Sequence, residues 1–459
     1  MRLIQIFKSL LLLACIGLAS CSSDSESETV EPEKDAILQI TSGSSIDFGE
    51  IIIGEEGEAS FQIKNTGESD LVVSSFTMPS YVSLNKISAT LTPGQSLDVL
   101  VSIKPTEVNT YSDIIAIVSN AASGENTITL TGSSRSSIFT GDVNLKSQQE
   151  VDDFGSKNYT GVFGNVFIGV DSGETDITDL GPLNSLTSIS ENLTIRNNKA
   201  LTSIAEFENF DTLGGNLFIS TNGLTAITGF QKLTKISGNL DLTGNNDLTS
   251  FTGFNSLSEI GGSLAINSNN ELQTLDDFTN LITIGTDLFI IGNSSLTSLN
   301  ALKNINATIS YLNISYTTAL TSLEGLESIT TVETLEIAGN IALADFQGLG
   351  NLTEVSGTFT IQNNQALINL NGLDKLTTIG ESFVIDNNSS MINLDGPTTL
   401  TSLNAALLIT GNSNLDDFCG LSQLIKNGAV TESSYSVTSN KYNPSYEQIQ
   451  NDGAGGCKL

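Results

Sequence analysis

Apolar side chains recur along residues 139–430 with a period of about 24 residues. A pair of apolar residues separated by one position occurs once per period, first at Leu193/Ile195 and last at Leu407/Ile409. Because alternate side chains of a strand point to opposite faces, both members of a pair should point inward and the residue between them outward. Neighbouring repeats then bury the apolar side that one repeat cannot bury alone. This periodicity predicts a mainly β chain with a parallel β-solenoid of about ten repeats.

A column of asparagines accompanies these pairs, three residues after the second member of each. We expect this column to lie where the chain turns off each strand, with its amides bonding the backbone of adjacent coils. A ligand-binding stripe is the alternative, and a structural ladder is the interpretation we favour. The column contains Asn198, Asn222, Asn245, Asn269, Asn293, Asn340, Asn364, Asn388 and Asn412, and Thr317 replaces asparagine in one repeat.

Residues 37–132 have a different pattern, with short alternating strands separated by turn signals about every ten residues. This pattern predicts an antiparallel β-sandwich without a cysteine pair or tryptophan. The motifs Asp47-Phe48-Gly49, Asn65-Thr66-Gly67, Leu91-Thr92-Pro93-Gly94 and Lys104-Pro105-Thr106 resemble the major-sperm-protein-like immunoglobulin-fold module. That module recurs in cilium proteins and in bacterial surface proteins of the choice-of-anchor type. The resemblance implies a spacer or interaction module, and residues 133–138 are expected to form a polar linker.

The repeats also resemble a known family, the receptor L-domain. The resemblance is carried by units such as Gly238-Asn239-Leu240-Asp241-Leu242 followed by Asn245 and Leu248. It implies a right-handed, leucine-rich-repeat-like solenoid over residues 139–430. L-domains bind unlike partners through unlike surface residues, so the family predicts a fold more than a ligand. Pro397 in an apolar column departs from the pattern, and no receptor-type cysteine-rich module follows, so a hormone-receptor role is not expected.

The first residues read as an address. Residues 1–20 have a basic start and a short apolar run, and the following Leu18-Ala19-Ser20-Cys21 resembles a bacterial lipobox. We therefore expect a lipoprotein signal peptide, lipidation of Cys21 and an acidic tether over residues 21–36. Ser22 is not aspartate, which favours the outer membrane by resemblance to Gram-negative lipoproteins. The tether resembles a surface-export signal, so the cell surface is expected, with the periplasmic face as the alternative.

Two cysteines remain in the mature chain, Cys419 and Cys457. In an oxidising compartment they should form a disulfide that stabilises the C-terminal end by about 3–4 kcal/mol. Residues 431–459 are expected to cap the solenoid, with a short helix that begins after Ser445.

Composition limits the chemistry of this chain. It has 18 Lys and Arg against 51 Asp and Glu, and no histidine. The net charge of −33 argues against nucleic acid as a partner, and the lack of histidine removes triad and common zinc chemistry. The pairs Asp276-Asp277 and Asp416-Asp417 could serve a polysaccharide-cleaving enzyme, although adjacent carboxylates in turns favour a structural role. We expect no enzyme, no cofactor and no metal site.

Outward strand positions are the candidates for ligand binding. Exposed aromatic side chains on a flat sheet commonly anchor proteins or sugars. The sequence thus predicts a lipid-anchored envelope protein that binds or adheres to a glycan or a surface protein. A structural scaffold without an external ligand is the alternative, and the oligomeric state stays open. The candidate binding face consists of Phe218, Asp241, Phe289, Ile291 and Tyr311.

Overall fold

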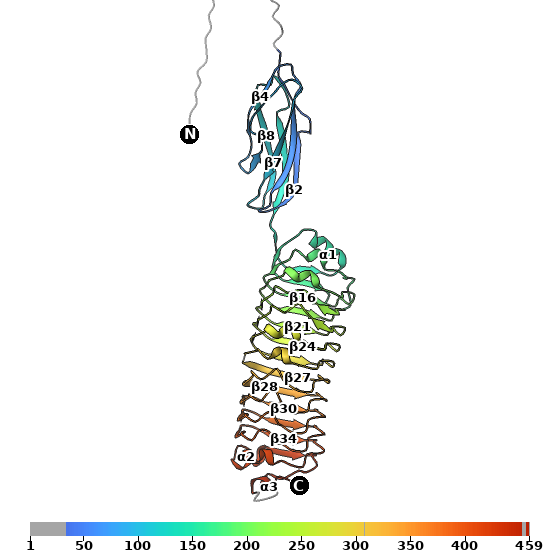
Figure 1. Ribbon diagram of the computed structural model, residues 1–459, viewed down its shortest axis with the longest axis vertical. Coiled ribbons are helices and arrows are strands. Elements are labelled where there is room, and N and C mark those ends of the chain that lie inside the picture. The colour runs from blue at the N-terminus through green and yellow to red at the C-terminus, as the bar shows by residue number, and fades with distance from the viewer. Residues whose placement is uncertain (1–33, 307, 452–455, 459) are drawn as a thin grey trace, which may run out of the picture. The chain divides into compact units, whose positions relative to one another are not determined.

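A computed structural model describes residues 34–306, 308–451 and 456–458 of the chain. The expected signal peptide and Cys21, with most of the tether, lie outside the described residues. The described chain is mainly β and divides into two compact units, the first ending at Arg135 and the second beginning at Ser136. Figure 1 shows both units, with residue number given by colour. No helix of the described chain is long and apolar enough to cross a membrane.

The first unit is a β-sandwich of two five-stranded sheets. Alternate residues of its strands, such as Phe61, Ile63, Val99 and Ile115, point into one apolar core between the sheets. One sheet has the order β5 (Val82–Leu84), β7 (Ser96–Ile103), β3 (Gly57–Asn65), β1 (Ile37–Ile40) and β9 (Ser123–Gly124). The other has the order β2 (Ser45–Ile52), β10 (Thr127–Arg135), β8 (Thr110–Ser119), β4 (Leu71–Thr77) and β6 (Ala89–Leu91).

The sandwich is not antiparallel throughout, as the sequence analysis expected. β1 pairs with β9 and β2 pairs with β10 in parallel, while the other pairs are antiparallel. The reason is that the first stretch of chain divides and passes from one sheet to the other between β1 and β2. Gly43 lies at this crossing with a φ of +92°, which a residue without a side chain adopts readily. Residues 133–135, expected in the linker, instead complete β10.

The second unit is built on a 16-stranded sheet whose repeat-related strands are parallel and follow each other in chain order. Successive strands pair with equivalent residues 23 or 24 positions apart, as in Leu193 opposite Leu217 and Leu217 opposite Leu240. The main path contains β12 (Val143–Leu145), β14 (Val166–Gly169), β16 (Leu193–Arg196), β18 (Leu217–Ser220), β21 (Leu240–Thr243), β24 (Leu264–Asn267), β26 (Leu288–Ile291), β27 (Ile309–Ser315), β28 (Thr331–Ala338), β30 (Phe359–Gln362), β32 (Phe383–Asp386), β34 (Leu407–Thr410) and β35 (Tyr435–Thr438). This stack is consistent with a solenoid, and Figure 1 shows its strands following one another in chain order from β16 to β34.

A second parallel sheet uses a short strand that precedes each main strand. Its order is β11 (Ile138–Thr140), β13 (Gly161–Phe163), β15 (Ser188–Ile189), β17 (Thr212–Leu213), β20 (Lys235–Ile236), β23 (Glu259–Ile260) and β25 (Thr283–Ile284). Later repeats contribute β29 (Glu354–Val355), β31 (Thr378–Ile379) and β33 (Ser402–Leu403), which branch from β28, and a separate pair joins β19 (Ala226–Ile227) to β22 (Ser250–Phe251). Between these layers lies one continuous apolar core.

In β27 and β28 the corner between the two strands of a repeat is missing. Elsewhere the last buried residue of the short strand and the first of the main strand are four positions apart, as in Ile284 and Leu288. In these two repeats the separation is three, from Ile309 to Leu312 and from Val332 to Leu335. One residue fewer leaves no room for the turn, so the two strands merge into one strand.

Short helices close the ends of the second unit. Helix α1 (Gln148–Gly155) begins at Ser147, whose hydroxyl accepts from the Glu150 N–H. Helix α3 (Tyr446–Gln450) begins at Ser445 in a capping box with Gln448, which confirms the predicted helix start. The remaining helices are α2 (Ser422–Lys426) and the 3₁₀ turns η1 (Gly181–Leu183), η2 (Ala205–Asn209), η3 (Asp276–Asn280), η4 (Asn300–Leu302), η5 (Cys419–Leu421) and η6 (Glu432–Ser434).

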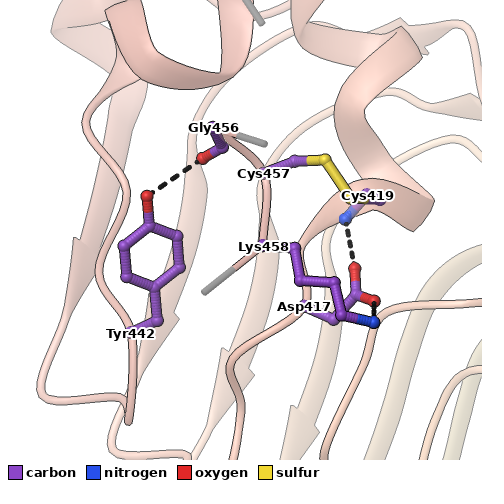
Figure 2. The surroundings of a disulfide bond; sticks show 6 residues. All are labelled: Asp417, Cys419, Tyr442, Gly456, Cys457 and Lys458. Carbon is purple, nitrogen blue, oxygen red and sulfur yellow. Dashed lines mark hydrogen bonds and ion pairs between the residues drawn. A yellow bond between two sulfur atoms is a disulfide. The ribbon is translucent and has the colours of Figure 1, made fainter. Parts of the chain in front are cut away.

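The C-terminal residues are fastened to the last repeat by a disulfide between Cys419 and Cys457. Figure 2 shows its surroundings: Asp417 accepts from the Cys419 N–H at 3.0 Å and from the Lys458 ammonium at 2.7 Å. The Tyr442 hydroxyl donates to the Gly456 carbonyl at 3.1 Å. This segment therefore rests on three kinds of bond, covalent, ionic and hydrogen-bonded.

Candidate functional site

All nine asparagines of the predicted column are buried within the second unit. Each side chain bonds the backbone of the preceding coil, as Asn245 illustrates. Its Oδ1 accepts from the Asn222 N–H at 3.1 Å, and its Nδ2 donates to the Ile219 carbonyl at 2.8 Å. The column continues beyond the predicted set to Asn440, whose Oδ1 accepts from the Asn412 N–H at 2.9 Å. With its polar atoms used in this way, the column holds coils together and offers no surface to a ligand.

A left-handed residue precedes the asparagine in each turn. Asn197, Thr221, Ser268 and Asn363 have φ values between +54° and +59° there. Glycine fills the same position in other repeats, for instance Gly244 with a φ of +73°. This conformation lets the chain leave the strand sharply and brings the following asparagine inside.

A second polar ladder, which the sequence analysis missed, lines the outward side of the main sheet. It occupies the position directly before the apolar pair of each repeat. Asn216 donates through its Nδ2 to Asn192 Oδ1 at 2.7 Å, and the Asn239 N–H donates to Asn216 Oδ1 at 2.7 Å. The recurrence of asparagine at this position in four successive repeats was the signal that could have revealed it. The ladder consists of Asp142, Asn165, Asn192, Asn216, Asn239 and Ser263.

The five predicted face residues lie on four strands of the main sheet with half-buried side chains. Phe218, Asp241 and Phe289 belong to one register row, in which Ala265 separates Asp241 from Phe289. Ile291 lies two positions after Phe289 on β26, on the same face. Tyr311 stands on β27 next to them. The structure therefore divides the predicted face into a Phe218–Asp241 part and a Phe289–Ile291–Tyr311 part, with the small Ala265 between.

The Phe289 and Tyr311 rings form the aromatic centre of this face. They pack edge to face, with ring centroids 5.3 Å apart. The merged strand β27 positions Tyr311, because the missing corner residue turns a loop position into a strand position. The Tyr311 N–H donates to Asp287 at 3.1 Å, which ties the tyrosine to the end of β26.

A polar network surrounds the tyrosine hydroxyl. Tyr311 donates to Glu336, and Asn313 Nδ2 donates to the same Glu336 oxygen at 2.9 Å. Asn313 is only 8% exposed although it points to the outward face, and Ser315 donates to its Oδ1. Burial, followed by the hydrogen bond to Glu336, raises the pKa of Tyr311, so the phenol stays protonated. Sequence reasoning placed Asn313 and Glu336 outward without linking them to Tyr311.

Asp241 is a carboxylate in a partly apolar place, paired in register with Phe218 on one side and Ala265 on the other. Burial raises its pKa, and a hydrogen bond from the Thr243 hydroxyl opposes that shift. A half-buried carboxylate without a cation partner among the described residues is able to accept hydrogen bonds from a ligand.

The paired carboxylates considered for hydrolysis have structural contacts. Asp277 accepts from the Phe254 N–H. Asp416 pairs with Lys441 and Asp417 with Lys458. Across the described residues, no group of three or more cysteines and acidic side chains is arranged to hold a metal ion.

Comparison with known proteins supports the fold of the first unit. The family described as HYDIN/CFA65/VesB-like, Ig-like domain matches residues 36–133. The first unit is therefore an Ig-like module, in line with the predicted immunoglobulin fold. No curated protein matches the chain.

Two solved structures are similar to part of the chain. The PapD-like domain 7 of human CEP192 is 16% identical, with a TM-score of 0.19, covering 25% of this chain and 99% of that domain. The Vibrio cholerae VesB protease is 17% identical, with a TM-score of 0.18, covering 22% of this chain and 31% of the protease.

Proposed function

We propose that this chain is a lipid-anchored cell-envelope protein that presents a receptor-L-domain-like β-solenoid for binding or adhesion to a glycan or a surface protein. The observation that carries the proposal is the cluster of Phe289, Ile291 and Tyr311 beside Asn313 and Glu336. Aromatic and aliphatic side chains supply contact area, while the adjacent amide and carboxylate supply hydrogen bonds that fix orientation. Elsewhere the polar columns of the second unit are spent on its own backbone, which leaves this outward face as the variable surface.

The ligand-binding test compares retention of wild type, Phe289→Ala and Tyr311→Ala on immobilised polysaccharides and on surface proteins of neighbouring cells. Both variants should lose retention, because each removes a ring from the same cluster. Phe163→Ala is the matched control, since Phe163 is 66% exposed but lies on β13 of the other sheet. Equal retention of all four proteins would reject this face as the binding site. A scaffold without a ligand would show no retention at all, and an enzyme would release reducing ends.

The anchor is tested separately through Cys21. Lipidation there predicts that Cys21→Ser moves the protein from the membrane fraction to the soluble fraction and abolishes labelling with a radioactive fatty acid. Protease treatment of intact cells then separates the two orientations. Loss of the protein on intact cells supports surface display, whereas protection until permeabilisation supports the periplasmic face and strengthens the scaffold alternative.

A further inference from the structure

A second recessed place lies at the first strands of the main sheet, away from the Phe289–Tyr311 cluster. It is a surface depression of about 310 Å³ that β12, β14 and the turn after β14 enclose. Its size is in the range of a small-molecule subsite. The lining residues are Asn144, Lys146, Phe167, Val170, Asp171 and Ser172.

The side chains at this depression combine an apolar surface with several polar groups. Phe167 is half-buried and lies in the same register row as Asn144 and Thr194. Asn144, Asp171 and Ser172 are exposed and bring an amide, a carboxylate and a hydroxyl to the same place. An aromatic face beside several hydrogen-bonding groups suits a ring that is apolar on one side and bears hydroxyls around its edge, as a sugar does.

Charge distinguishes this depression from the remainder of the face. On the main-sheet face of the described chain, the cations are Lys146 and Arg196, which flank the same row of β14. Gly169 lies between them without a side chain, and a Cβ there would come within 1.9 Å of the Arg196 carbonyl oxygen. Further along, the face carries the carboxylates of Asp241 and Glu336 instead.

The two cations have different partners. Arg196 Nη1 lies 3.4 Å from Asp171 Oδ1, so the arginine neutralises the one carboxylate of the depression. The Lys146 ammonium has no ion pair within the described part of the chain, and the nearby Glu150 carboxylate accepts from the Lys146 backbone N–H. The depression therefore keeps one uncompensated positive charge in a chain whose net charge is −33. A ligand that brings a carboxylate next to a sugar ring matches this charge.

We propose that this depression binds an acidic saccharide, a chain of uronic acid residues, with the carboxylate on Lys146 and Arg196 and one sugar face on Phe167. The inference deepens the proposed function, on which it rests, by giving a ligand class and a second subsite. Asn144, Ser172 and Asp171 then accept from or donate to the hydroxyls at the ring edge.

The test is calorimetric titration of the full chain with oligosaccharides of galacturonate, of alginate and of hyaluronan, each beside its carboxyl-reduced neutral form. At least one acidic oligosaccharide should bind, and its neutral form should bind about tenfold more weakly because the charge-assisted hydrogen bonds are lost. Raising the salt concentration should weaken binding of the acidic form. Lys146→Gln and Phe167→Ala should each lower affinity about tenfold or more.

Matched controls locate the effect. Lys303→Gln removes an exposed lysine from another part of the second unit, and Phe163→Ala removes an exposed ring from the other sheet; both should leave affinity unchanged. The proposal is overturned if none of the three acidic oligosaccharides binds, if the neutral forms bind equally well, or if Lys146→Gln binds as wild type does. Binding that Tyr311→Ala abolishes and Lys146→Gln retains would overturn this subsite while supporting the proposed function. Failure of both sets of variants to change binding would reject both.

Discussion

At the scale of single residues, the asparagine ladder explains why this sequence tolerates tight turns inside its core. A buried N–H or carbonyl without a partner costs about 1–3 kcal/mol, and every coil would leave such groups at its turn. One amide side chain supplies both an acceptor and a donor, so asparagine satisfies two of them at once. Thr317 breaks the ladder, because its hydroxyl bonds the Ile290 and Ser315 carbonyls and provides no amide oxygen for the Asn293 N–H.

This break gives a stabilising substitution. Thr317→Asn should restore the bond to the Asn293 N–H and raise the free energy of unfolding by about 1 kcal/mol. The measurement is chemical denaturation followed by circular dichroism. Thr321→Asn is the control, since Thr321 is exposed outside the ladder and should leave stability unchanged. Equal midpoints for wild type and Thr317→Asn would contradict the role assigned to the ladder.

Asp241 gives a pH-dependent prediction at the same scale. Because burial raises its pKa in the folded state, the folded protein holds this proton to higher pH than the unfolded chain does. Stability is therefore lost as pH rises from the ordinary carboxyl pKa through the raised one. Asp241→Asn should raise the melting temperature at neutral pH, and the gain should disappear in acid. Asp247→Asn, at an exposed turn, should show no such gain; the same result for both variants would rule out burial as the cause.

At the scale of elements, the end helix α3 depends on one cap. Ser445 accepts from the Gln448 N–H at 3.2 Å, and Gln448 accepts from the Ser445 N–H at 2.7 Å. Ser445→Ala should weaken the helix by about 1 kcal/mol. In a repeat array this loss stays local, so hydrogen exchange of residues 446–450 should quicken while that of β26 does not. Ser436→Ala, at an exposed position of β35, should leave both rates as they are. Faster exchange throughout would indicate that the cap supports the whole array.

The strands and the first ladder could be predicted because they rest on a fixed period and on strand alternation. The merger in β27 and β28 could not, since the steps between apolar pairs stay at 23 or 24 residues while one corner residue is lost. The network of Tyr311 with Glu336 follows from that merger and was missed with it. Phe167 was overlooked because its repeat has stretched spacing. The parallel pairs of the sandwich depend on a strand that changes sheets at Gly43, a tertiary choice that local alternation does not encode.

At the scale of the whole molecule, the second unit gains its stability from contacts between neighbouring coils, so its ends are where opening begins. Residues 456–458 return to the last repeat, where the Phe418 N–H donates to the Cys457 carbonyl at 2.7 Å. The disulfide closes a loop with a sequence separation of 38 residues around α2, β35 and α3. Figure 2 shows that Lys458 and Gly456 bond the same region from either side of Cys457.

Removing this closure should therefore open the C-terminal end first. The loop-entropy account gives about 4 kcal/mol for a loop of this length, more than its few hydrogen bonds and one ion pair can replace. A Cys419→Ala/Cys457→Ala variant should show limited proteolysis within residues 419–451 under conditions that leave wild type intact. Hydrogen exchange at β16 and β18 should stay slow in both proteins, because those coils keep their neighbours. Simultaneous loss of protection in all coils would mean that the second unit unfolds as one cooperative body, and the disulfide would then stabilise every repeat rather than the last.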